Sequence, residues 1–308
     1  MAEITIEELL VSGAHFGHLA RLWNPKMRPY IFMKKNGVHV LDLKKTLVML
    51  NSSANAIREL AENGEKILFV GTKKQAQEII KNEAERCGMY YITERWLGGT
   101  LTNLQTVRRS IKTLKNIEKM FADGTADSLK KNERLTLERK RLKLETVLSG
   151  IKDLNRLPGA LFVVDIKKEH IAIAEAKKLD IPVFAIVDTN CDPEIVDHVI
   201  PANDDAFKSI AVITKTIADS VLEGAQIHQE KVKALDMDKI LKDADFSRKN
   251  RDSRGGGKDA PRRRRRKRRS EEDSAPKSAA PTKQAPTPAA PKAEVKVEAP
   301  KETSKSEE

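Results

Sequence analysis

The chain has 308 residues, a formal net charge of +12, and 33% charged residues. It contains no run of about 18 apolar residues, and its opening MAEITIEELL lacks the apolar core of a signal peptide, which argues against a membrane protein. Its two cysteines, Cys87 and Cys191, have no CxxC spacing, which argues against a disulfide framework or a zinc knuckle. We expect a cytoplasmic protein without membrane contact.

The positive charge is unevenly distributed. Residues 247–308 hold 19 Lys and Arg against 10 Asp and Glu, so they contribute most of the net charge. Elsewhere, residues 21–45 carry seven basic residues against one Asp, and residues 95–119 carry six against one Glu. Phosphate contact depends on such local clusters, so these two segments are candidate surfaces for a polyanion.

The first unusual segment is 15–31, HFGHLARLWNPKMRPYI, in which prolines stiffen a basic and aromatic stretch. We interpret it as an irregular nucleic-acid contact segment that precedes the regular core. The alternative is a strap whose Phe16 and Trp23 fill a core while its charges are solvated. The candidate contacts are Arg21, Lys26 and Arg28 for phosphates, Trp23 for bases or riboses, and Asn24 as a donor and acceptor.

Short apolar runs alternate with helical patterns through most of the chain. A helix over 5–12 begins with a capping box of Thr5 and Glu8. The runs are too apolar for a one-sided sheet, so we predict an α/β fold with a parallel sheet and helices on both faces. The predicted strands are 38–41, 66–71, 160–165, 181–188 and 198–201, and the predicted helices are 43–62, 73–87, one ending near 179, and 204–224.

The alternation is interrupted over 102–157. Apolar residues recur there at helical spacing from Leu104 to Phe121 and again from Leu137 to Ile151, with a turn near Asp123 between the two runs. This pattern predicts an antiparallel helical hairpin that protrudes from the sheet domain. The alternative is a pair of ordinary surface helices. The domains are therefore an α/β domain over 1–101 and 158–228, the inserted hairpin over 102–157, and a flexible low-complexity tail over 229–308.

The tail is expected to be disordered, because from Ser247 onward it has no aromatic residue and is dominated by Ala, Pro, Lys and Glu. Its run RRRRRKRR over 262–269 will bind phosphate backbones with little sequence preference. Nuclear targeting and a membrane surface are alternative uses of such a run. A free-standing nucleic-acid chaperone driven by the tail is one rival function.

Catalytic motifs are absent from the sequence. GTKK over 71–74 follows an apolar run but lacks the spacing of a phosphate-binding loop, so Lys73 and Lys74 are candidates for an RNA phosphate instead. The rival from another class is a nucleotide-binding enzyme that uses the Gly71 turn and a crevice containing Asp188 and Asp204. A second recognition segment is ERWLGGTLTNL over 94–104, where the alternative is a glycine hinge with a buried Trp96. Its candidate contacts are Arg95 and Trp96, followed by Arg108, Arg109 and Lys112.

Carboxylates follow several predicted strands. Together with His15 or His18, Asp188 and Asp204 form a possible site for a divalent ion such as zinc or magnesium, and we take His18 as the imidazole ligand. The alternatives are helix capping by Asp204 and turn hydrogen bonding by Asp188 and Asp192. No cofactor is required for the expected function.

Five blocks in a fixed order resemble the bacterial family of small-subunit ribosomal protein two. They are HFGH with WNPKM, ILFVGTKKQA, RWLGGTLTN, LPGALFVVD, and IPVFAIVDTNCDP with IPANDDA. The resemblance covers residues 3–228 and implies a Rossmann-like (flavodoxin-like) sheet domain with a protruding coiled-coil hairpin. It also implies that the protein has a structural role and is not an enzyme.

The resemblance also implies partners and contacts. The partners would be small-subunit ribosomal RNA and other small-subunit proteins, including the large mRNA-binding protein one, with no homo-oligomer in the working state. The resemblance also implies that Asn103 contacts RNA, in addition to the residues already named. The tail departs from the short end that is usual in the family.

Overall fold

Five parallel strands form the central sheet. The computed structural model describes residues 4–252, and the side chains of 4–235 and 237. The strand order is β5-β4-β6-β7-β8, which is the flavodoxin-like order, and every neighbouring pair is parallel. The predicted α/β fold is therefore confirmed. The strands are β4 (Ile67–Val70), β5 (Tyr90–Ile92), β6 (Ala160–Val164), β7 (Val183–Val187) and β8 (His198–Pro201).

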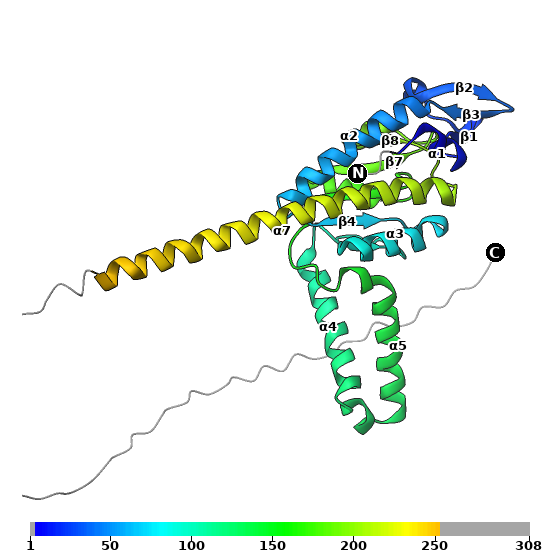
Figure 1. Ribbon diagram of the computed structural model, residues 1–308. Coiled ribbons are helices and arrows are strands. Elements are labelled where there is room, and N and C mark those ends of the chain that lie inside the picture. Colours follow the sequence, from blue (N-terminus) through cyan, green and yellow to red (C-terminus); the bar gives the residue numbers. More distant parts are fainter. Residues whose placement is uncertain (1–3, 253–308) are drawn as a thin grey trace, which may run out of the picture. The chain divides into compact units, whose positions relative to one another are not determined.

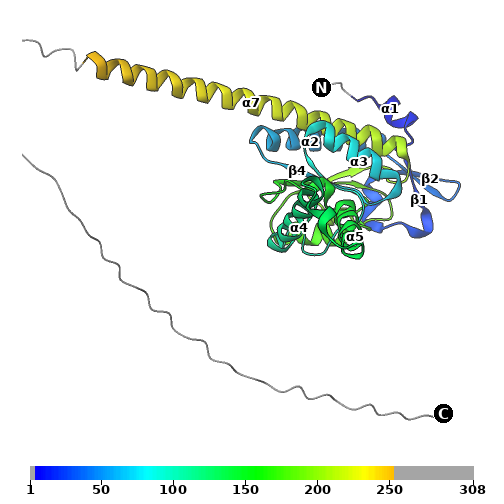
Figure 2. The same cartoon turned by 90° about the horizontal axis from the view of Figure 1, so that it is seen from below.

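Helices cover both faces of this sheet. Alternate strand residues point to opposite faces, so Phe69 and Phe162 belong to one core while Leu68 and Leu161 belong to the other. The helices α2, α3 and α7 pack on the first face, where Figure 2 shows them together. The second face is covered by α6 and the bases of α4 and α5. The first-face helices and α6 are α2 (Leu43–Glu62), α3 (Lys74–Cys87), α7 (Phe207–Asp252) and α6 (His170–Lys178).

The segment predicted to be irregular is partly regular. It contains strand β1 and ends where strand β2 begins. Both strands belong to a small antiparallel sheet with the order β1-β3-β2, of which only β3 was predicted. The strands β1 and β2 were missed because their side chains are mostly exposed and show no apolar alternation. The elements here are β1 (Phe16–Leu19), β2 (Ile31–Lys35), β3 (Val38–Leu41), and the 3₁₀ helices η1 (Ala20–Leu22) and η2 (Pro25–Tyr30).

Two helices between β5 and β6 lie side by side and antiparallel. They are α4 (Leu104–Ala122) and α5 (Lys131–Leu148), joined through η3 (Thr125–Ser128) and followed by η4 (Ser149–Ile151). Figure 1 shows the pair extending away from the sheet. The helix α4 buries one stripe of apolar residues, whereas Leu148 is the buried residue of α5. The Arg141 guanidinium of α5 lies 5.8 Å from the centre of the Phe121 ring on α4.

The first and last described helices, α1 and α7, test two predictions. The capping box of Thr5 and Glu8 is present at α1 (Ile6–Val11), as predicted. The predicted helix end near Gly224 is wrong, because α7 continues to Asp252 and makes residues 229–252 helical. Gly224 serves close packing instead: a Cβ there would lie 2.5 Å from the Arg58 carbonyl oxygen of α2.

The rest of the predicted tail, 253–308, lies outside the described residues. Between residues 4 and 252, no helix has the length and apolar character needed to cross a membrane.

Candidate nucleic-acid interface

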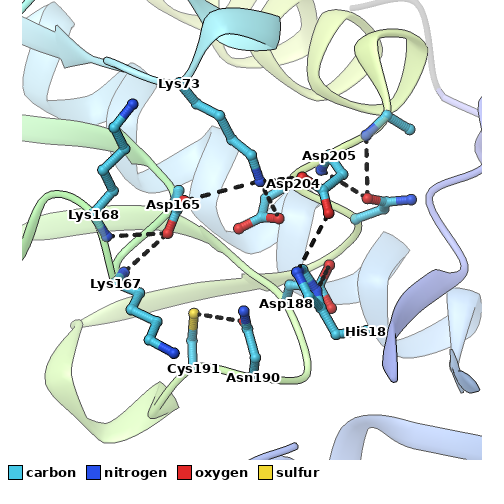
Figure 3. Close-up of polar contacts among 12 residues, drawn as sticks. His18, Lys73, Asp165, Lys167, Lys168, Asp188, Asn190, Cys191, Asp204 and Asp205 are labelled. Carbon is cyan, nitrogen blue, oxygen red and sulfur yellow. Dashed lines mark hydrogen bonds and ion pairs between the residues drawn. The ribbon is translucent and has the colours of Figure 1, made fainter. Parts of the chain in front are cut away.

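The carboxyl ends of the parallel strands bring several predicted residues together. Lys73 follows β4, Asp165 follows β6, Asp188 follows β7 and Asp204 follows β8, and all four meet in one cluster (Figure 3). Ligand atoms of His18, Asp188 and Asp204 lie within 4.8 Å of one another. The structure therefore assembles the three residues that were predicted to share a divalent ion.

His18 is held by two carboxylates. Its Nδ1 lies 3.0 Å from Asp188 Oδ2, and its Nε2 lies 3.3 Å from Asp205 Oδ2. The contact with Asp188 raises the pKa of His18 above its ordinary value of 6.5, against the effect of burial, and the charges of Asp204 and Asp205 add to the increase. His15, the other candidate imidazole, is half-buried beside the Phe16 ring, and burial lowers its pKa.

Lys73 is the resident cation of the cluster. Its Nζ lies 2.8 Å from Asp204 Oδ1, 2.5 Å from Asp205 Oδ1 and 3.9 Å from Asp165 Oδ2. Burial works to lower the pKa of Lys73, but its ion pairs outweigh that effect and raise it. Burial, together with the charge of Asp188, raises the pKa of Asp204 to about 6. The ammonium of Lys73 is committed to internal carboxylates, which corrects its assignment to an RNA phosphate, whereas Lys74 is exposed.

A carboxylate of the protein itself lies at the switch point of the parallel sheet. Strand order reverses between β4 and β6, which is the switch point where this kind of fold usually binds ligands. Glu169, which is 2% exposed, accepts hydrogen bonds from the N–H and hydroxyl groups of Thr72 there. Lys168 Nζ donates to the Thr72 carbonyl at 2.6 Å. Both donors of Thr72 are therefore already committed to a carboxylate of the protein itself.

Thr189, at the end of β7, holds the N-terminal segment. Its Oγ1 accepts a hydrogen bond from the His18 N–H at 2.9 Å, and its carbonyl accepts one from the Asn24 N–H at 2.8 Å. Gly17 is required at this contact, because a Cβ there would lie 2.6 Å from Thr189 Cγ2. The HFGH block thus has a packing role that periodicity does not reveal.

The predicted contacts of this segment divide into committed and free side chains. Asn24 Oδ1 accepts a hydrogen bond from the Lys26 N–H at 3.0 Å, so the Asn24 side chain caps η2. Lys26 Nζ lies 2.9 Å from Asp192 Oδ2 and 2.5 Å from Glu194 Oε2, although it stays exposed. Trp23 is half-buried, with its ring 5.1 Å from that of His39.

Arg21 and Arg28 are exposed and have no ion pair in the described part of the chain. They are the side chains of the segment that are free to meet phosphates.

The second segment lies at the same edge of the sheet, because it follows β5. Trp96 is buried and its indole N–H donates to Glu175 Oε1 at 3.1 Å, which matches the alternative of a buried Trp96 and disfavours it as an RNA contact. Arg95 and Asn103 are exposed, and Asn103 Oδ1 accepts a hydrogen bond from the Thr106 hydroxyl at 2.9 Å. The remaining predicted contacts are exposed on α4: Arg108, Arg109 and Lys112.

Two buried acids, Glu169 and Glu175, were not predicted. Glu169 directly precedes α6 and Glu175 lies within it, and their partners are 73 to 97 residues away along the chain. The sequence holds only a weak signal for Glu175: it lies on the apolar face of a short helix, where a carboxylate is unfavourable unless it is paired.

The chain is similar to known proteins of one family. The profile of the family described as Ribosomal protein S2 matches residues 9–224. A relative from Chlorobaculum parvum is 55% identical over 243 residues, covering 79% of this chain and 97% of its own length. One from Cytophaga hutchinsonii is 61% identical over 219 residues, covering 71% of this chain and 86% of its own. Both are named small ribosomal subunit protein uS2.

The order of sequence blocks, the fold and these relatives lead to the same conclusion. The family consists of structural ribosomal proteins and not enzymes, which removes the enzymatic alternative. The chain belongs to the ribosomal protein S2 family.

Proposed function

We propose that this protein is a structural constituent of the small ribosomal subunit in the cytoplasm, that it binds small-subunit ribosomal RNA, and that it supports translation. Family membership carries this proposal, since the relatives are named for that subunit. The partners are the ribosomal RNA and neighbouring small-subunit proteins. The finer partner, the large mRNA-binding protein one, follows from the family resemblance. In its working state the protein is part of the ribonucleoprotein and does not form a homo-oligomer.

The RNA-contact surface combines free cations from the two segments. Because all five strands are parallel, the loop after β5 and the segment held at the end of β7 occupy the same sheet edge. Three strand spacings separate them, or about 14 Å, a span that one folded RNA backbone can bridge. We define the RNA-contact surface as the exposed side chains of Arg21, Arg28, Lys74, Arg95, Asn103, Arg108, Arg109 and Lys112, with Lys26 and the half-buried Trp23 at its border.

The hairpin of α4 and α5 serves as an arm of this surface. The apolar stripe of α4 and the contact between the two helices support coiled-coil packing. The exposed cations Arg108, Arg109 and Lys112 all lie in the first half of α4, next to the sheet. The arm therefore extends the basic surface away from the sheet edge.

Charge removal tests the RNA-contact surface. The variant with Arg21→Ala and Arg28→Ala should bind a transcript of small-subunit ribosomal RNA about tenfold more weakly, and its plot of log affinity against log salt should be shallower by about two units. The matched control is Lys208→Ala with Lys215→Ala, which removes the same charge from exposed positions on α7. Equal affinities and salt slopes for the two variants would exclude Arg21 and Arg28 from this surface.

The cluster of His18, Asp188 and Asp204 supports a second candidate, binding of a divalent ion. One imidazole nitrogen and two carboxylate oxygens within 4.8 Å suit zinc or magnesium. Lys73 competes, because its ammonium already neutralises Asp204. Titration calorimetry with zinc and with magnesium should therefore show one site that weakens at least tenfold in Asp188→Asn, while Asp153→Asn, an exposed control, binds normally. The absence of saturable heat with either ion would exclude the site.

A further inference from the structure

Glu175 connects helix α6 to the loop that precedes the arm. The residue is 8% exposed, and its Oε1 accepts hydrogen bonds from the Trp96 indole at 3.1 Å and from the Gly99 N–H at 2.7 Å. Its Oε2 accepts from the Leu101 N–H at 3.0 Å. It also accepts from the N–H and hydroxyl of Thr102 at 3.1 and 3.2 Å. One carboxylate therefore gathers donors from along the whole of residues 96–102.

The loop depends on this carboxylate because it has little regular structure of its own. No helix or strand occurs between Ile92 and Leu104, and Gly99 has φ of +87°, a left-handed conformation that favours glycine. The helix that carries Glu175 is itself fixed, since Ala172 and Ala176 are fully buried against the second face of the sheet. The carboxylate thus transfers the rigidity of the sheet domain to the loop.

The hydrogen bonds also determine the charge of Glu175. Burial alone would raise its pKa, but the donated hydrogen bonds, that of the Thr102 N–H first and then that of the Trp96 indole, outweigh burial and lower it. The carboxylate is therefore ionised at neutral pH. Charge-assisted hydrogen bonds of this kind are stronger than neutral ones.

Successive N–H groups that converge on an anion are a common way for loops to bind phosphate. In this loop Glu175 fills that position, so RNA cannot be bound by the inner amides. Contact must come from the outward side chains, of which Arg95 and Asn103 are exposed. Helix α4 begins at Leu104, directly after the loop, so the loop also sets where Arg108 starts the basic face of the arm.

We propose that Glu175 is a positioning residue for RNA recognition: it holds the loop 96–102 so that Arg95 and the first cations of α4 are arranged before RNA binds. This inference rests on the proposed RNA-contact surface. Preorganised cations lose less conformational freedom on binding, so weakening the carboxylate should weaken RNA binding even though Glu175 touches no RNA.

The test is a double-mutant cycle on the full-length protein, with a transcript of small-subunit ribosomal RNA as the probe. Glu175→Gln should bind about tenfold more weakly at fixed salt, a loss equivalent to one or two phosphate contacts. Arg95→Ala should weaken binding in the wild type and have a much smaller effect in Glu175→Gln, because the two residues act through one arrangement. Hydrogen exchange at the amides of Gly99, Leu101 and Thr102 should become faster in Glu175→Gln.

Two further variants separate positioning from general stability. Trp96→Phe keeps an aromatic ring in the core but removes one donor to Glu175, so it should weaken binding in the same direction by a smaller factor. Glu169→Gln removes the other buried carboxylate near α6, and the effect of Arg95→Ala should be unchanged in it. Thermal unfolding confirms that each variant is folded at the temperature of the binding measurement.

The outcomes are distinguishable. Additive effects of Arg95→Ala and Glu175→Gln, or faster amide exchange with unchanged affinity, would overturn the positioning role while leaving the RNA-contact surface intact. If Arg95→Ala and the variant lacking Arg21 and Arg28 both bound RNA normally, the proposed surface itself would be wrong.

Discussion

His18, in the first strand of the small sheet, lies with its Nδ1 3.0 Å from the buried carboxylate of Asp188 at the end of β7. The next residue, Thr189, accepts hydrogen bonds from the His18 and Asn24 N–H groups. These contacts therefore join the basic and aromatic segment 15–31 to the edge of the parallel sheet. It gives Arg21 and Arg28 a rigid support, because the chain on which they lie is tied down in front of Arg21 and again at Asn24.

This contact should make stability depend on pH. Asp188 raises the pKa of His18 above 6.5, so the folded state binds that proton more tightly than the unfolded state. The resulting stabilisation is complete below pH 6.5 and is lost as pH rises through the folded pKa. Asp204 acts in the same direction at lower pH: its pKa rises from 3.8 to about 6, so stability falls as pH increases across that interval.

Urea unfolding with a chelator present measures the effect. His18→Asn should lower the free energy of unfolding more at pH 6 than at pH 8. The comparison with the wild type at each pH isolates His18, because burial lowers the pKa values of His15, His39 and His198 and gives them the opposite pH dependence in both proteins. The control is His170→Asn, at an exposed histidine of α6, which should behave like the wild type. A pH dependence that survives unchanged in His18→Asn would contradict the assignment.

Lys73→Met should destabilise the fold. The substitution keeps most of the side-chain volume but leaves the buried carboxylate of Asp204 without its cation. We expect a loss of about 2 kcal/mol in the free energy of unfolding, below the range for a fully buried pair because Lys73 is partly solvated. Lys74→Met, at the exposed neighbouring position, is the control and should change stability by less than about 0.5 kcal/mol. Equal losses in the two variants would show that the cluster does not need the ammonium.

Gly17→Ala should destabilise the attachment of the N-terminal segment by about 2 kcal/mol, because the added Cβ overlaps Thr189. Because of this overlap, the effects of Gly17→Ala and Thr189→Ala on stability should be strongly coupled. In a Thr189→Ala background the same substitution should cost clearly less, since the two nearest atoms are removed and only the His39 carbonyl oxygen, at 3.1 Å, remains. A double-mutant cycle by urea unfolding measures the coupling, and additive losses would mean that the strain arises elsewhere.

Removing residues 253–308 should separate specific from non-specific RNA binding. The removed part contains the run RRRRRKRR, so weak binding to unrelated RNA should decrease and its salt dependence should flatten. Incorporation into small subunits, measured by co-sedimentation in high salt, should persist because the RNA-contact surface remains. Loss of incorporation together with all RNA affinity would favour the chaperone driven by the tail.

The sequence was sufficient for the main elements of the fold. The runs KILFVG and ALFVVD and the helical patterns between them predict a parallel sheet, because apolar periodicity is a local property of the chain. Three short strands were not predicted: β1 and β2 are short and mostly exposed, and β5 has three residues. Gly224 was interpreted as a helix end, whereas it allows α7 to pack closely on α2.

The sequence by itself determined which cations and aromatics belong to the two basic segments, and it excluded the known catalytic motifs. Only the tertiary structure decided which of those side chains are free to meet RNA. Lys73 is paired with Asp204, and Trp96 is buried against Glu175, whereas Arg21 and Arg95 remain exposed. The reason is physical: burial and pairing depend on contacts between residues that are often more than seventy positions apart, and these contacts exist only once the parallel strands have brought their carboxyl ends together.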